Sequence, residues 1–178
     1  MNTVPKLDLD YEVIKQFIRN SHAESVVMIG CDSVRKASGT KATALYSTVV
    51  VVRKSSGHGV FHGCKIFGTS VRLPDYGKVI RSGKLANLKL RLLQEVTFAL
   101  EAFDGVQEAI GDRPFEIHLD IASDPRWESN VAMNDAKGYV LGVTGREPNF
   151  KPTALAASFA ADAVAHGMEV DTGRMTAH

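Results

Sequence analysis

Apolar positions recur along the chain with two different periods, and these periods separate the expected helices from the expected strands. An apolar residue returns every three or four positions over Asp8–Asn20, and again over Lys84–Phe103. Such spacing is typical of amphipathic helices. Compact apolar runs rich in β-branched residues instead predict strands over Ser25–Asp32, Ala42–Arg53 and Val60–Phe67.

Polar and glycine-containing segments join these first elements. Ser33–Thr40 is predicted to be a loop, and Ser55–Gly59 is predicted to be the turn of a β-hairpin. A basic connection, Gly68–Gly83, then leads into the long helix. The first half of the chain is therefore expected to form a meander of three antiparallel strands.

The second half of the chain alternates between strands and helices. Apolar runs predict strands over Phe115–Ala122 and Gly138–Val143, with a short helix over Trp127–Met133 between them. Pro152 is in the position favoured for a first helical turn, and the alanine-rich segment Thr153–His166 predicts the last helix. The residues expected on the packed side of that helix are Leu155, Phe159 and Ala163.

This order of elements predicts one α/β domain over residues 1–178, with an N-terminal helix over about 8–20 and a loose tail over about 171–178. Early hairpins and later helical crossovers predict a five-stranded mixed sheet in the order 3-2-1-4-5, with strand 2 antiparallel to strand 1. Helices are expected to cover both faces of this sheet.

Composition excludes several classes of protein. No apolar run approaches the roughly 20 residues of a membrane span, and the first ten residues contain acids and lack the apolar core of a secretory signal. Cys31 and Cys64 form no CxxC motif and are expected to be small buried residues that pack in a reduced protein. We therefore expect a cytoplasmic protein with no membrane partner.

The net charge of +1 conceals an uneven distribution of charge. The segment Ser33–Lys89 contains eleven basic residues and a single acid, so the rest of the chain is acidic. A basic middle flanked by acidic parts suits a polyanion such as nucleic acid, although solvated lysines without a partner would give the same pattern. The expected phosphate contacts are Lys78, Arg81, Lys84 and Lys89.

Carboxylates follow apolar runs at two points of the sequence, and further acids lie on the expected helices. Asp32 ends the first strand and Asp120 is near the end of the fourth, where an uncompensated charge would be costly. Glu95 lies at the border of the buried stripe of the long helix, Glu101 is expected on its solvent side, and Asp162 lies beside the packed side of the last helix. These acids indicate a site for divalent cations, although Glu95 alone would also fit an ordinary surface glutamate.

The order of strands, helices and acids resembles the ribonuclease H-like superfamily, and more narrowly its YkuK-type family. The similarity covers nearly the whole chain after the first helix, and each of its motifs is short. The residues that carry it are Ile29–Ser33, Gln94-Glu95, His118–Ile121, Ser129-Asn130, Gly138–Gly142, Lys151-Pro152 and Ala156–Asp162. The last helix also resembles the alanine-rich, Asp-bearing final helix of RuvC-type resolvases.

The resemblance implies a catalytic site with two metal ions, Mg²⁺ or Mn²⁺. Asp32 would be the ligand shared by both ions, and Glu95 and Asp120 would each hold one ion. Asp162 would complete one coordination shell, with Asp124 as a reserve acid.

His118 lies two residues before Asp120 and is therefore expected on the same face of the strand. It would support the metal ligands as a partner in the second shell, or it would be a core histidine whose hydrogen bonds are satisfied.

These residues predict a metal-dependent nuclease that hydrolyses phosphodiester bonds in RNA, RNA/DNA hybrid or structured DNA. The alternative is a ribonuclease H-like module without turnover that binds nucleic acid or a protein partner. An actin-like nucleotide-binding fold shares the strand layout, but the chain is short for its two-domain cleft and no glycine-rich phosphate loop follows the first strand. The sequence does not distinguish among the nucleic-acid substrates, or between a monomer and an oligomer.

Overall fold

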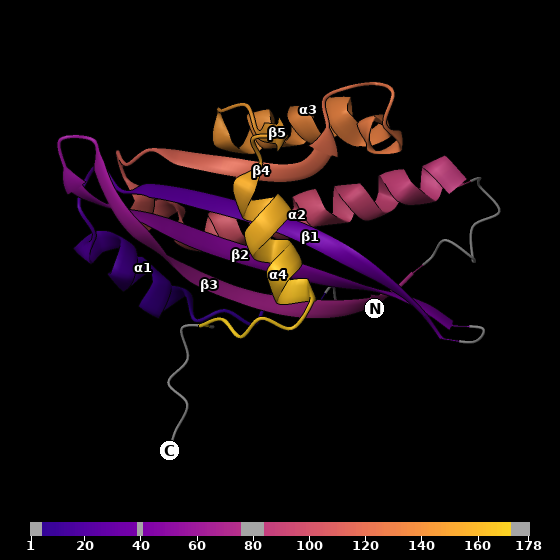
Figure 1. Ribbon diagram of the computed structural model, residues 1–178, viewed down its shortest axis with the longest axis horizontal. Helices are drawn as coiled ribbons and strands as arrows, with labels where there is room; N and C mark the ends of the chain where they lie inside the picture. Colours follow the sequence, from indigo (N-terminus) through magenta and orange to yellow (C-terminus); the bar gives the residue numbers. More distant parts are fainter. Residues whose placement is uncertain (1–4, 39–40, 76–83, 172–178) are drawn as a thin grey trace, which may run out of the picture.

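A five-stranded mixed sheet forms the centre of the protein in the computed structural model, which describes residues 5–38, 41–75 and 84–171 (Figure 1). Its strands are β1 (Val26–Ser38), β2 (Lys41–Gly57), β3 (Val60–Pro74), β4 (Phe115–Ala122) and β5 (Asn149–Lys151). They are arranged in the order β3-β2-β1-β4-β5, with β2 antiparallel to β1 and with β4 parallel to both β1 and β5. The predicted α/β fold, strand order and antiparallel strand 2 are confirmed.

Helices cover both faces of the sheet, as predicted (Figure 1). The helical elements are α1 (Tyr11–Asn20), α2 (Lys84–Ile110), η2 (Glu128–Ala132), α3 (Met133–Thr144), η3 (Ala156–Ala161) and α4 (Asp162–Ala165). The apolar sides of α1, α2 and α3 form the larger core with one face of the sheet, and η3 and α4 pack on the other face. No helix within the described residues is long and apolar enough to cross a membrane.

The predicted first helix is present, and its start is determined by a cap. Asp10 Oδ1 accepts hydrogen bonds from the N–H groups of Glu12 and Val13 at 3.1 and 3.2 Å, an arrangement that typically stabilises a helix by about 1 kcal/mol. Glu101 of α2, predicted to face solvent, is instead partly buried and accepts a hydrogen bond from the Leu7 N–H at 2.9 Å. That prediction was wrong because the segment before α1 lies against this side of α2.

Four elements extend beyond their predicted ends, among them β2, which continues past Arg53 to Gly57. β1 continues to Ser38 through the predicted loop Ser33–Thr40, β3 continues past Phe67 to Pro74, and α2 continues past Phe103 to Ile110. The polar parts of β1 and β3 remain extended because β2 lies between them and pairs with both. Antiparallel pairing satisfies backbone groups whatever the side chains are, and polar side chains on an open face do not oppose it.

The β2–β3 turn is shorter than the predicted segment Ser55–Gly59. It consists of His58 and Gly59, whose φ angles are 54° and 72°. Two-residue hairpin turns of the type that matches strand twist require this left-handed backbone conformation, which glycine adopts without strain.

The predicted fifth strand, Gly138–Val143, is wrong. This segment belongs to α3, where the buried residues Ala136 and Val140 are four positions apart and Tyr139 is 61% exposed. The apolar run therefore has the burial pattern of a helix, although its composition is typical of a strand. The fifth strand is instead β5, a few residues after α3 and outside every predicted strand, and the predicted helix Trp127–Met133 is the 3₁₀ helix η2 leading into α3.

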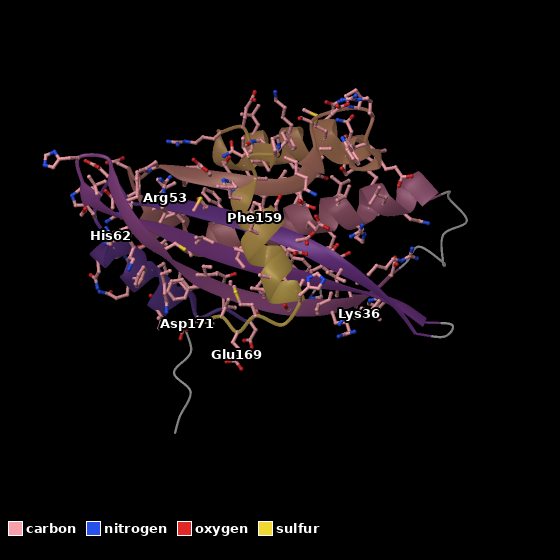
Figure 2. All side chains as sticks on the ribbon, in the orientation of Figure 1. Lys36, Arg53, His62, Phe159, Glu169 and Asp171 are labelled. Atoms are coloured by element: carbon pink, nitrogen blue, oxygen red, sulfur yellow. The ribbon has the colours of Figure 1, made fainter. Side chains whose placement is uncertain are left out.

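The last helix also differs from the regular helix predicted over Thr153–His166. It begins at Leu155, three residues after Pro152, and the next six residues, Ala156–Ala161, form the π-helical turn η3. Leu155 and Phe159, predicted on the packed side, are 51% and 68% exposed (Figure 2). These larger side chains therefore lie away from the sheet, and Ala156, Ala157 and Ala161 are the buried residues of this segment.

The close approach of η3 to β1 explains why alanines face the sheet. A Cβ atom on Gly30 would lie 2.7 Å from the backbone nitrogen of Ala157. Ala156, Ala157 and Ala161 are buried in this contact, and larger side chains would separate the helix from the sheet. Gly30 therefore sets the distance between η3 and β1.

The expectations for the tail and the cysteines need correction. Asp171 is not loose, because its carbonyl oxygen accepts a hydrogen bond from the Gly68 N–H at 3.0 Å and its carboxylate lies 2.8 Å from Lys65 Nζ. The rest of the predicted tail, residues 172–178, lies outside the described residues. Cys31 is buried as expected, but Cys64 is exposed, since it lies on β3 at the edge of the sheet.

We expect Gly30→Ala to destabilise the protein, because the added methyl group would overlap main-chain atoms of η3. Overpacking of this kind costs about 1–3 kcal/mol, and urea denaturation would show it as a lower free energy of unfolding. Gly138→Ala is the matched control: a Cβ there meets no atom within 4 Å, and alanine is favoured over glycine in a helix by about 0.8–1.0 kcal/mol. Equal destabilisation by both substitutions would contradict the proposed role of Gly30.

Candidate functional site

Two aspartates lie side by side just beyond the last paired residues of the neighbouring parallel strands β1 and β4. The last residues paired between β1 and β4 before them are Cys31 and Leu119, so Asp32 and Asp120 each follow by one residue. Side chains alternate between the two faces along a strand, and Cys31 and Leu119 belong to the core beneath α2. Asp32 and Asp120 therefore share the opposite face, on which η3 and α4 pack.

Groups from two other elements hold Asp120. Its Oδ1 lies 2.8 Å from Lys151 Nζ and accepts a hydrogen bond from Ser158 Oγ at 2.9 Å. Lys151 is the last residue of β5, and Ser158 belongs to η3. The π-helical turn thus brings a hydroxyl group onto the acidic end of β4, and π-helical turns are frequent at functional sites.

Asp162 adds a third acid on this face of the sheet. It is the first residue of α4, and its side chain is half exposed. Its Oδ1 lies 3.2 Å from His166 Nδ1, so it has a partner within its own helix. Asp162 nevertheless lies close enough to Asp32 for their charges to interact.

The proximity of these acids and the burial of Asp32 make the charged form of Asp32 unfavourable. Burial raises the pKa of the Asp32 carboxyl to about 6, and the charges of Asp120 and Asp162 act in the same direction. The Ser33 N–H and the Lys151 ammonium oppose this rise in pKa. Charge on Asp32 is therefore disfavoured until a cation or a proton compensates it.

Glu95 approaches the site from the other face of β1. It is 2% exposed, although its sequence position predicted the border of the buried stripe. Ser33 Oγ donates a hydrogen bond to Glu95 Oε1 at 2.5 Å, and Arg91 Nη1 lies 3.7 Å from the same oxygen. Arg91 also donates to the carbonyl oxygen and Oγ of Ser33 at 3.0 and 2.6 Å. Burial raises the pKa of Glu95 well above its ordinary value, and the charge of Asp32 adds to this effect.

The hydrogen bonds of His118 are directed away from the four acids. This residue is fully buried, and its Nδ1 accepts a hydrogen bond from the Ala156 N–H at 2.8 Å. Neutral imidazole then carries its proton on Nε2, which lies 2.7 Å from Glu116 Oε2 and 3.2 Å from Asn149 Nδ2. Of the two roles considered for His118, these contacts match the core histidine, and they fix the start of η3.

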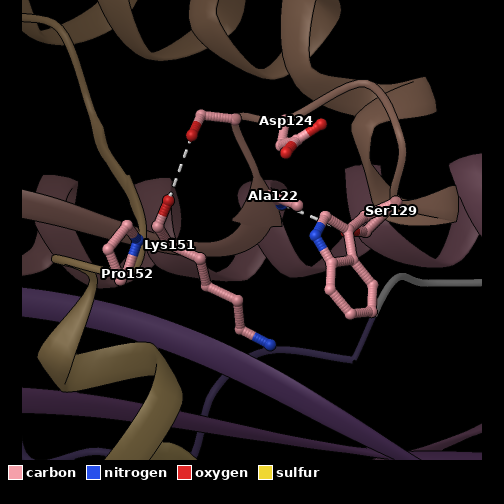
Figure 3. Close-up of a pocket in the computed structure, with 7 residues that line it drawn as sticks. Ala122, Asp124, Ser129, Lys151 and Pro152 are labelled. Atoms are coloured by element: carbon pink, nitrogen blue, oxygen red, sulfur yellow. Dashed lines mark hydrogen bonds between the residues drawn. The ribbon is translucent and has the colours of Figure 1, made fainter.

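Asp124, the predicted reserve acid, lies in a separate pocket (Figure 3). Arg126 binds it with its backbone N–H at 2.9 Å and with its guanidinium at 2.5–3.0 Å. This side-chain bond, assisted by the backbone bond, lowers the pKa of the Asp124 carboxyl. Asp32, Asp120 and Asp162 together are called the acidic group below. The pocket adjoins this group, because Lys151 lines the pocket and contacts Asp120.

Sequence reasoning missed the donors that contact the acids, namely Lys151, Ser158, Arg91 and Ser33. Ser33 and Arg91 are one residue after Asp32 and four residues before Glu95, so a search of the neighbours of each acid would have found them. Lys151 and Ser158 give no such signal. They reach Asp120 only because β5 and η3 fold onto β4 from about 30 residues further along the chain.

The predicted basic contacts are only partly placed. Lys78 and Arg81 lie outside the described residues, as does the side chain of Lys84 at the start of α2. Lys89 forms an ion pair with Asp135 of α3. The prediction that these four residues bind phosphate therefore stays a prediction.

The acidic group provides oxygen ligands suited to a divalent cation, but these oxygens do not converge on one point. Within the described parts of the chain, no group of three or more His, Cys, Asp or Glu side chains is placed to hold a metal ion. Carboxylate oxygens are nevertheless the ligands preferred by Mg²⁺ and Mn²⁺. The Lys151 ammonium, 2.8 Å from Asp120 and acting electrostatically on Asp32, lies where a cation would be expected.

Comparison with known families agrees with the fold. The chain matches the family model described as Ribonuclease H-like over residues 11–166, which is most of its length. The protein therefore belongs to this ribonuclease H-like family. Within the superfamily, this is the YkuK family that the sequence motifs resemble. Comparisons with curated proteins and with solved structures find no match.

We expect Asp32→Asn to stabilise chelator-treated protein at neutral pH. The folded state binds the Asp32 proton more tightly than the unfolded chain, so stability falls as pH rises from about 3.8 to about 6. Removing the charge should raise the free energy of unfolding at pH 7 by roughly 1–3 kcal/mol and flatten its pH dependence in that window. Urea denaturation between pH 4 and pH 7.5 measures both effects.

Asp112→Asn is the control for this substitution, because Asp112 is exposed in the turn before β4. It should leave the pH profile unchanged. If Asp32→Asn lowers stability at pH 7 without altering the profile, Asp32 is a structural hydrogen-bonding residue and its charge is already compensated.

Proposed function

We propose that this protein is a metal-dependent nuclease that hydrolyses phosphodiester bonds in RNA, RNA/DNA hybrid or structured DNA. The observation that carries the proposal is the grouping of Asp32, Asp120 and Asp162 on one face of the sheet, where their charges repel. Buried acids that repel one another are stabilised by a cation between them. Membership of the ribonuclease H-like family supports the same chemistry.

Asp32, Asp120 and Asp162 would hold Mg²⁺ or Mn²⁺ through their carboxylate oxygens, with Asp32 as the shared ligand. When bound, two such ions activate the attacking water and stabilise the leaving oxygen. Glu95, the fourth acid of the predicted set, would have to exchange its hydrogen bond with Ser33 before it could take part.

We assign Lys151 two roles, one without metal and one with it. Without metal it neutralises Asp120 at 2.8 Å. A divalent ion between the carboxylates would compete with the ammonium, and the released lysine, 46% exposed at its side chain, would be free to contact a substrate phosphate.

One observation favours the alternative of a module that binds without turnover. Two of the four acids already have internal cationic partners, because Lys151 pairs with Asp120 and Arg91 lies near Glu95. Internal cations would make bound metal unnecessary for stability. The two functions are distinguished by whether cleavage depends on metal.

Exposed basic side chains on the same face of the sheet would position a nucleic-acid backbone. Lys36 follows Asp32 by four residues on β1 and therefore shares its face (Figure 2). Arg72 of β3 lies on this face as well, because it pairs with Leu45, which pairs with Val34 of β1. Both basic residues are exposed, so they are available to phosphates.

The proposal also includes the expected reducing, cytoplasmic location. It is supported by Cys31 and Cys64, neither of which forms a disulfide in the described structure.

Cleavage of labelled RNA, DNA and hybrid in Mg²⁺ or Mn²⁺ tests the nuclease directly. We expect activity that is lost with a chelator and reduced at least 100-fold by Asp120→Asn, because the substitution removes an anionic ligand. Asp112→Asn should retain full activity. Wild-type protein that binds all three substrates but cleaves none of them, in either metal, would establish the alternative.

We expect the double substitution Lys36→Ala/Arg72→Ala to weaken binding of all nucleic-acid sequences similarly. Each lost phosphate contact should reduce the slope of log K against log salt by roughly 1, so the pair should reduce it by about 2. Fluorescence anisotropy over a salt series measures the slope. Lys15→Ala/Arg19→Ala on α1 removes the same charge from the opposite face, and a similar change in its slope would contradict a localised contact.

A further inference from the structure

The pocket that contains Asp124 opens beside the acidic group and has a cavity volume of about 340 Å³ (Figure 3). Ala122, Trp127 and Pro152 supply its apolar lining, while Asp124, Ser129 and Lys151 supply polar groups. Its volume lies at the small end of the range for pockets that bind organic ligands. It therefore has room for one small organic group such as a single base, and it is too small for a duplex.

Hydrogen bonds hold this pocket in shape. The Ala122 N–H donates to Ser129 Oγ at 3.0 Å, and Asn130 Nδ2 donates to the carbonyl oxygens of Ala122 and Ser123 at 3.0 and 3.1 Å. These bonds tie η2 to the end of β4. A preformed pocket loses little free energy to ordering when a ligand binds.

The aromatic group of the pocket is unusually open to solvent. Trp127 is 65% exposed although tryptophan is the largest apolar side chain. An exposed indole next to a preformed cavity is a stacking surface, because any planar base can lie against it. Trp127 has no role in the acidic group or in the core of the protein.

Lys151 connects the pocket to the acidic group. Its side chain lines the pocket, and its Nζ lies 2.8 Å from Asp120 Oδ1. A nucleotide whose base entered the pocket would therefore have its phosphate near Lys151, whose side chain is 46% exposed and can contact an anion while it also pairs with Asp120. A nucleotide suits both parts, because its base is a planar group that stacks on an indole and its phosphate is an anion that a lysine attracts.

We propose that this pocket is a nucleobase subsite, in which one unpaired base of a nucleic-acid strand stacks on Trp127 while its phosphate lies at Lys151. This inference rests on the proposed function, because it assigns the acidic group a nucleic-acid substrate. Asp124, held by Arg126, presents a carboxylate at the rim that accepts hydrogen bonds from amino groups of bases. The subsite favours single-stranded or locally unpaired nucleic acid over continuous duplex.

Trp127 is the single tryptophan of the chain, so tryptophan emission, excited selectively over that of the four tyrosines, reports on this pocket. The full-length protein is titrated in EDTA, without metal and hence without cleavage, with a single-stranded oligodeoxynucleotide. An oligonucleotide of the same length made of abasic residues is the matched probe, with the same charge and no bases. We expect quenching of Trp127 emission by the first probe and little change with the second. Equal quenching by both would overturn the proposal, because the signal would then report binding of the backbone.

Substitutions provide the second readout, measured by fluorescence anisotropy with a labelled strand. We expect Trp127→Ala to weaken single-strand binding by about 5- to 160-fold, which corresponds to about 1–3 kcal/mol for one stacked base. Trp127→Phe should retain most of the affinity, because phenylalanine still stacks. Tyr139→Ala removes a similarly exposed aromatic residue outside the pocket and should bind as wild type. Wild-type affinity of Trp127→Ala would overturn the subsite.

The failure of this inference and that of the nuclease proposal are distinguishable. Base-dependent quenching without metal-dependent cleavage supports the subsite and rejects the nuclease. Metal-dependent cleavage that Trp127→Ala leaves unchanged in both KM and kcat rejects the subsite and supports the nuclease. Where both hold, Trp127→Ala raises KM for single strands more than for duplex and leaves kcat nearly unchanged.

Discussion

The contact between the backbone of η3 and β1 at Gly30 determines where Asp162 and Ser158 lie relative to Asp32 and Asp120, the two acids of the sheet. Because Gly30 has no side chain, η3 approaches β1 until main-chain atoms almost touch. The Ala156 N–H then reaches His118, and Ser158 reaches Asp120, so η3 is fixed to β4 as well as to β1. α4 continues directly from η3 and starts with Asp162, which this contact brings close to Asp32.

Placing acids this close has an electrostatic cost that the fold only partly offsets. Burial and the charges of two neighbouring aspartates raise the pKa of Asp32. Lys151 compensates part of this repulsion from β5, and Ser33 compensates part through its backbone N–H. An arrangement selected for stability alone would replace Asp32 with a neutral residue of similar shape. Retention of the charge at such a cost is typical of residues that serve a function.

The order of the sheet was predictable because its first four strands are visible in the sequence: β1 and β2 contain long apolar runs, and β3 and β4 have apolar residues interrupted by polar ones. Asp32 and Asp120 were predictable neighbours because each is near the end of such a predicted strand. The fifth strand was not predictable. Asn149–Lys151 is only three residues long, with one apolar residue between two polar ones, and it is a strand because β4 offers an open edge. Gly138–Val143 has the composition of a strand, but it is helical because it packs on α2 as part of α3. Lys151 and Ser158 depend on these same late elements, so their contacts with Asp120 were hidden as well.

Ser33 connects the two faces of the sheet at the site. Its backbone N–H supports the negative charge of Asp32 on the η3 face, while its Oγ donates a hydrogen bond to Glu95 on the α2 face. Arg91 binds the carbonyl oxygen and Oγ of the same residue, so Ser33 is fixed by α2. The charge of Asp32 in turn raises the pKa of Glu95 through the strand. A cation that favoured the charged form of Asp32 would therefore also change the protonation of Glu95. The hydrogen bond from Ser33 to Glu95, which opposes the rise in the pKa of Glu95, joins the two acids.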